Sequence, residues 1–125
     1  MLSRYSTAAL ALVLMTSACA RPEALDRRPY TPLFQSAVEA ARTHAQGTIA
    51  AAFAEAASAK TFGEAIGRWE AFLKRYPPEA ETEDAVQKRY IDAAVTELMR
   101  AYYLLGRQQD GDRLLLSTDP LGLRQ

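Results

Sequence analysis

The stretch TFGEAIGRWEAFLKRYPP, residues 61–78, decides the fold class because it carries a complete set of helix signals. Thr61 and Glu64 have the spacing of a capping box, in which each side chain satisfies a backbone N–H of the first turn. The apolar residues of the stretch follow at spacings of four, three, four and three, which places them on one face of a helix. They are Phe62, Ile66, Trp69, Leu73 and Tyr76. Pro77 and Pro78 stop the helix, since a residue before proline is pushed out of the α region, so the stretch predicts an amphipathic helix with one buried, aromatic-rich face.

Two helices are predicted before this stretch. The first begins at Thr31-Pro32, a capping residue followed by proline at the first helical position, and ends before Gly47. Thr48 caps the second helix, which runs through Lys60 and is made mostly of alanine. Small side chains let neighbouring helices approach closely, so we expect this second helix to be tightly packed.

A long helix and a short one are predicted after the prolines. Carboxylates gather at the start of the long helix, where the positive end of the helix dipole favours them, and it closes at Gly106. These carboxylates are Glu79, Glu81, Glu83 and Asp84. Its main apolar stripe is Ile91, Val95, Leu98, Tyr102 and Leu105, and a second stripe beside it is Val86, Tyr90 and Ala94. The short helix covers about Gln109–Ser117.

Composition supports an all-α fold of four to five helices in antiparallel hairpins. Alanine, the best helix former, accounts for 24 of the 125 residues, whereas Val and Ile together account for seven and Asn is absent. Half-buried strands favour β-branched residues, so a sheet protein is excluded. The 15 basic residues balance the 15 acidic ones, which leaves no global field of the kind that attracts nucleic acid.

The N-terminus has the pattern of a secretory signal over residues 1–18. Arg4 precedes an apolar core from Ala8 to Met15, which is too short to cross a membrane, because a spanning helix needs roughly 20 apolar residues. The following residues, TSAC, resemble a bacterial lipobox, in which the signal is cleaved before an acylated Cys. Thr16 stands where that motif usually has Leu. The alternative is an ordinary signal, cleaved after Ala18 or Ala20, that leaves a free thiol.

The lipobox resemblance implies that Cys19 is lipidated and anchors the chain to a membrane. Residues 19–31 then form a tether with two prolines and three arginines, and residues 32–125 form the helical domain. Ala20, and not Asp, follows the Cys. By resemblance to enterobacterial sorting, this implies the outer membrane, with the domain on the periplasmic face.

The residues offer little for catalysis. His44 is the sole histidine, and it lies near a predicted helix end where a cation opposes the dipole. The acidic group at 79–84 lacks the ligand spacing and the glycine of an EF-hand loop. No phosphate-binding glycine loop or nucleophile motif occurs. We therefore expect a protein that is not an enzyme and needs neither a cofactor nor a metal.

EAIGRWEAFLKRYP, residues 64–77, resembles the second helix of a tetratricopeptide repeat (TPR), in the variant found in bacterial envelope lipoproteins that assemble outer-membrane proteins. Ala65 takes the small packing position of that helix, and Trp69, Phe72-Leu73 and Pro77 take its other characteristic positions. The resemblance implies that the Thr48–Lys60 helix is the first of the pair.

A weaker second unit is similar over RAYYLLGRQQDGDRLL, residues 100–115, where Gly111 takes the small position. It lies 46 residues after Ala65, beyond the usual TPR period of 34. The alternative to a TPR-like arrangement is an unrelated, small irregular helical bundle.

Tyr102 and Tyr103 cannot both face one core, so we expect one of them to be partly exposed. The TPR resemblance implies that Thr96, Arg100 and Tyr103 line the concave surface where such repeats hold a peptide. The leading hypothesis is a lipid-anchored periplasmic scaffold that binds a protein or peptide partner in envelope assembly or secretion, and not nucleic acid. A compact structural accessory or pilotin-like subunit without a peptide groove is the alternative, and a periplasmic enzyme is the third.

Overall fold

Helices account for most of the described chain. The computed structural model describes residues 27–44, 46–80 and 82–118. Within these ranges the helices are α3 (Gln35–Ala41), α4 (Ile49–Ala57), α5 (Phe62–Arg75), α6 (Ala85–Leu104) and α7 (Gln108–Thr118). The same ranges contain no strand, only one isolated bridge between Pro29 and Thr61, so the all-α prediction is confirmed. The predicted signal and Cys19 lie outside the described residues.

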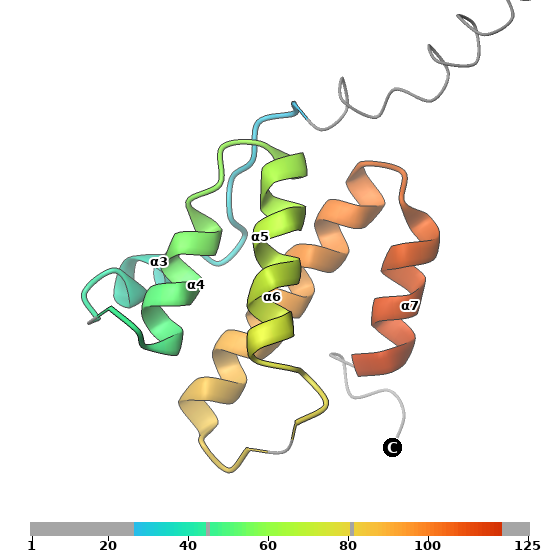
Figure 1. Ribbon diagram of the computed structural model, residues 1–125. Helices are drawn as coiled ribbons and strands as arrows, with labels where there is room; N and C mark the ends of the chain where they lie inside the picture. Colours follow the sequence, from blue (N-terminus) through green and yellow to red (C-terminus); the bar gives the residue numbers. More distant parts are fainter. Residues whose placement is uncertain (1–26, 45, 81, 119–125) are drawn as a thin grey trace, which may run out of the picture.

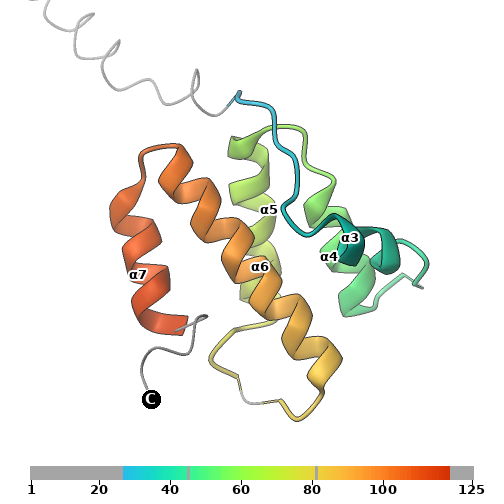
Figure 2. The same ribbon diagram turned by 180° about the vertical axis from the view of Figure 1, so that it is seen from behind.

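The helices pack against one another in the order of the chain. From α4 to α7 they run in alternating directions, and each contacts the next. α3 packs on α4, and α4 also reaches α6. In Figure 1, α6 crosses behind α5, with α4 and α7 on opposite sides, and Figure 2 shows the same crossing from behind. In the part of the chain that the structure describes, no helix is both long and apolar enough to span a membrane.

The predicted caps explain where α4 and α5 begin. The Thr48 hydroxyl accepts a hydrogen bond from the Ala51 N–H (3.2 Å), and the Thr61 hydroxyl accepts one from the Glu64 N–H (3.2 Å). The Glu64 carboxylate bonds back to the N–H of Lys60, also at 3.2 Å, one residue before the cap. The capping box of α5 is therefore present with its return bond shifted by one residue.

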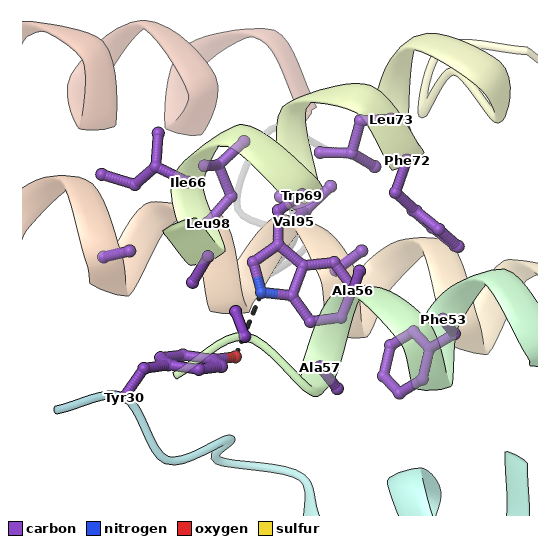
Figure 3. Close-up of a cluster of buried hydrophobic side chains, with 14 of the residues drawn as sticks. Tyr30, Phe53, Ala56, Ala57, Ile66, Trp69, Phe72, Leu73, Val95 and Leu98 are labelled. Carbon is purple, nitrogen blue, oxygen red and sulfur yellow. Dashed lines mark hydrogen bonds between the residues drawn. The ribbon is translucent and has the colours of Figure 1, made fainter. Parts of the chain in front are cut away.

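Trp69 stands at the centre of the core. Its side chain and that of Phe53 on α4 are fully buried, with ring centroids 5.1 Å apart. Phe72 packs on the same indole with a centroid separation of 5.8 Å (Figure 3). The whole main stripe of α6 is also buried: Ile91, Val95, Leu98, Tyr102 and Leu105. The aromatic face of α5 is thus sandwiched between α4 and α6, as the spacing predicts.

Two helices begin later than the sequence predicts. The long helix starts at Ala85, because the Asp84 carboxylate accepts hydrogen bonds from the N–H groups of Val86 and Gln87 and so caps it. Glu79 and Glu83 therefore lie in the preceding loop, and Val86 of the second stripe is 58% exposed. The first helix is also shorter than predicted, since it covers only Gln35–Ala41.

The N-terminal strap, residues 28–33, is the reason for the shorter first helix. Its backbone is extended against the start of α5: Phe62 donates to the Arg28 carbonyl (3.0 Å), and Tyr30 donates to the Lys60 carbonyl (2.9 Å). Tyr30 is buried in the core, with its ring edge-on to that of Phe62. The predicted tether through Thr31 was therefore too long, because Arg28–Thr31 belong to the packed domain.

Candidate functional site

A buried carboxylate lies where the N-terminal strap crosses α6. Glu97 is only 1% exposed. One carboxylate oxygen accepts a hydrogen bond from the Tyr30 hydroxyl, and the other accepts one from the Leu33 N–H at 2.7 Å. The Trp69 indole N–H in turn donates to the Tyr30 oxygen at 3.1 Å, the bond drawn in Figure 3. A buried charge needs such partners, so this network fixes the strap to both α5 and α6.

Arg100 completes the network from the next turn of α6. Its guanidinium lies 3.6 Å from the Glu97 carboxylate and donates to the Thr31 carbonyl at 2.6 Å. The guanidinium also lies over two rings: its central carbon, Cζ, is 5.7 Å from the centroid of the Tyr30 ring and 5.5 Å from that of the Phe62 ring. Arg100 therefore acts as a clamp that holds the strap, since both its charge and its flat face are engaged within the domain.

The network is better suited to holding the strap in place than to transferring a proton through the Tyr30 hydroxyl. Burial and then the hydrogen bond to Glu97 raise the pKa of Tyr30 well above its ordinary value. The hydroxyl thus stays protonated and keeps donating. Within the described residues, no histidine or thiol adjoins it, and no group of three or more potential metal ligands occurs.

The predicted partner-binding residues lie along one face of α6, but the domain itself uses two of them. Thr96 is half-buried, and its hydroxyl donates to the Asp92 carbonyl at 3.0 Å. Arg100 holds the strap, and the Tyr103 hydroxyl donates to the Asp112 carboxylate of α7 at 2.6 Å. In Figure 2, α6 itself runs between the strap and α7. Thr96 bonds within its own helix and is partly exposed, and we call the surface around it the Thr96 strip.

The two adjacent tyrosines divide as the sequence predicts. Tyr102 is 8% exposed and Tyr103 is 38% exposed. Tyr103 lies against Gly111 of α7, where an added Cβ would come within 2.7 Å of the Tyr103 ring. A small residue at Gly111 is thus required for the close approach of α6 and α7.

The effect of Gly111→Ala on the free energy of unfolding should change sign when the Tyr103 ring is removed. In the parent chain we expect a loss of about 1 kcal/mol of unfolding free energy, because the methyl group displaces the ring. In a Tyr103→Ala background the same change should add about 0.5–1 kcal/mol, since alanine favours the helix. Urea unfolding of the four chains measures both values. The same sign in both backgrounds would contradict the contact.

The Tyr102 hydroxyl should make the stability of the domain decline at alkaline pH. The hydroxyl donates to Glu70 at 3.0 Å, and burial followed by this bond raises its pKa from 10.0 to about 12. Since the folded state holds the proton more tightly, this contribution is complete below pH ~10 and is lost as the pH rises towards about 12. Thermal melts across that window should show a shallower decline for Tyr102→Phe than for the parent. Parallel declines would rule out Tyr102 as the titrating group.

Two other features of the described surface are a groove between α4 and α5 and the exposed His44. A shallow groove of about 310 Å³ between α4 and α5 has an alanine floor and the ring of Phe72. Arg68 at its rim is already bonded to Glu64 (2.6 Å) and to the Glu55 carbonyl (2.8 Å). His44 is exposed, and its backbone N–H donates to the Ala41 carbonyl at 3.2 Å.

No protein-family model, curated protein or solved structure matches this chain. The class that the described residues define is a small all-helical domain of five helices, packed in chain order and closed by an extended N-terminal strap.

Proposed function

We propose that this protein is a lipid-anchored helical scaffold on the periplasmic face of the outer membrane. It binds a protein or peptide partner in envelope assembly or secretion and is not an enzyme. The observation that carries the proposal is Cys19, placed at the end of TSAC directly after a short apolar core. Thioether-linked diacylglycerol and an N-acyl chain together give stable attachment, whereas one acyl chain holds a protein only marginally.

Three observations support a TPR-like organisation of the scaffold. Ala65 is fully buried, in keeping with the small packing position of a second TPR helix. Gly111 allows the equivalent close approach between α6 and α7. The contact between α4 and α6 would then join the first helices of the two proposed units, as neighbouring repeats require.

The engagement of Arg100 and Tyr103 favours a second candidate function. Because these two side chains are held in hydrogen bonds, to the strap and to α7, they are less available to a partner than Thr96. A compact accessory or pilotin-like subunit needs no peptide groove. The two candidates therefore differ in whether a partner touches the Thr96 strip.

Site-directed photocrosslinking in cells separates these candidates. A photoreactive residue at Thr96 should give a discrete adduct if the strip binds a partner. The matched control is Val86, which lies on the same helix and is 58% exposed. Adducts from neither position, or equal adducts from both, would favour the accessory without a groove. Arg100 is unsuitable for this test, since its replacement would release the strap.

Lipidation has its own test. Cells fed an alkyne-labelled fatty acid should incorporate it into the parent chain and not into Cys19→Ser. Globomycin should leave a larger precursor. A mature chain of normal size without label would contradict the anchor.

A further inference from the structure

The chain enters the domain at one end of the molecule. Arg28 bonds through its carbonyl to Phe62 at the start of α5, and through its guanidinium to the Leu104 carbonyl at the end of α6 (2.9 Å). Figures 1 and 2 show that α7 also begins at this end, while the loop between α5 and α6 lies at the other. We call the end where the chain enters the domain the entry end. It comprises residues 27–28, 60–62 and 103–107.

The tether is too short to carry the entry end far from Cys19. Seven residues separate Cys19 from Arg27. A fully extended chain covers at most about 3.6 Å per residue, so the two Cα atoms lie within about 29 Å of each other. If Cys19 is acylated, the entry end is held within that distance of the lipid surface. Contact is then effectively intramolecular and needs little intrinsic affinity.

Charge makes the entry end suited to an anionic surface. Arg27, Arg28 and Lys60 are exposed there, and no described acidic side chain forms an ion pair with any of them. Basic groups close to an anionic bilayer each strengthen binding by about fivefold. The loop at the other end carries Glu79 and Glu83, Asp84 caps α6 beside it, and the basic residues Lys88 and Arg89 are exposed one turn further on.

The entry end also exposes the side chains that suit a membrane interface. Leu104 is 43% exposed and Tyr103 is 38% exposed, both in the last turn of α6. Tyrosine is enriched at membrane–water interfaces because its ring is apolar and its hydroxyl polar. Apolar and basic groups thus share one small surface at the point where the tether arrives.

We infer that the entry end docks on a negatively charged phospholipid surface through Arg27, Arg28 and Lys60, with Leu104 at the headgroup level. This inference rests on the proposed lipid anchor at Cys19. Docking orients the domain so that the acidic loop between α5 and α6 points away from the membrane. The Thr96 strip, about two turns before Tyr103 and Leu104 on α6, then lies near the membrane and open to a partner.

Fluorescence quenching by brominated lipids tests this orientation on the whole mature chain. Coupling Cys19 to a maleimide-bearing lipid reproduces the anchor whether or not cells acylate this residue. The lipoprotein proposal is therefore tested separately, by the fatty-acid labelling described above. Two reporter chains carry Leu104→Trp or Val86→Trp, at opposite ends of α6, and the parent chain supplies the Trp69 background. The vesicles are phosphatidylcholine, with or without about one third phosphatidylglycerol.

Docking predicts strong quenching of the tryptophan at 104 and little at 86, only on vesicles with phosphatidylglycerol and only at low salt. Arg27→Glu with Lys60→Glu should remove the quenching. Lys88→Glu with Arg89→Glu makes the same change in net charge on exposed residues near the far end and should leave it intact. Equal quenching at the two positions, no dependence on phosphatidylglycerol, or equal effects of the two charge reversals would overturn the inference. The entry end would then face solvent or a protein.

Discussion

Replacing Trp69 with alanine should lower the free energy of unfolding by about 3–5 kcal/mol, the cost of a large cavity in a packed core. The indole is fully buried between Phe53 and Phe72, and its N–H is the donor that holds the Tyr30 oxygen. Both the cavity and the lost bond act in the same direction. Since a domain of this size is stable by only about 5–15 kcal/mol, much of the margin disappears.

Urea unfolding followed by far-UV circular dichroism measures this effect, because the variant lacks the fluorescent side chain. Val86→Ala is the matched control: its side chain is 58% exposed, and we expect a change within about 0.5 kcal/mol. A loss below about 1.5 kcal/mol for Trp69→Ala would contradict a core centred on this indole.

Glu97→Ala should cost about 3 kcal/mol, because a buried network loses its central acceptor. The Tyr30 hydroxyl and the Leu33 N–H would each lose a partner, and Arg100 would lose its counter-charge. Glu97→Gln keeps one acceptor oxygen in the same volume and should cost about 1–2 kcal/mol. We expect the strap to detach first in the alanine variant. Protection from hydrogen exchange should fall at the Tyr30 amide and at Phe62, the first residue of α5, before it falls in the middle of α5 and α6.

A double-mutant cycle isolates the contact between the strap and α6. Tyr30→Phe and Glu97→Gln, alone and together, should show a coupling energy of about 1 kcal/mol or more. Glu83→Gln, an exposed carboxylate in the loop before α6, is the control and should not couple to Tyr30→Phe. Additive losses from Tyr30→Phe and Glu97→Gln would show that the two side chains are energetically independent.

The elements that local signals specify were predicted well. α5 combines a cap, a periodic apolar face and a double proline, and each of these features acts within a few residues of its own position. The main stripe of α6 was likewise predicted in full, because helical spacing alone decides which side chains share a face. The predicted start of α6 was wrong, because both Glu79 and Asp84 suit a helix N-terminus and only the cap geometry distinguishes them.

The candidate site was predicted only in part. Thr96, Arg100 and Tyr103 do share one side of α6, and Tyr103 is the more exposed of the paired tyrosines. The role of Arg100 as a clamp was not predicted, because it depends on the strap, of which residues 28–31 were assigned to the tether. One signal was present: Glu97 interrupts the run of Ala94, Leu98 and Ala101, an apolar context in which a carboxylate requires a partner.

The N-terminal strap also orders events during folding. Its anchoring contacts join residues 76 and 67 positions apart in the chain, from Arg28 to Leu104 and from Tyr30 to Glu97. The helical hairpins, by contrast, close over short loops and form early. The strap is synthesised first, yet it cannot dock until the end of α6 has been synthesised. Until then the indole N–H of Trp69 and the Glu97 carboxylate lack their native partners, so the nascent domain is complete only when its two ends meet.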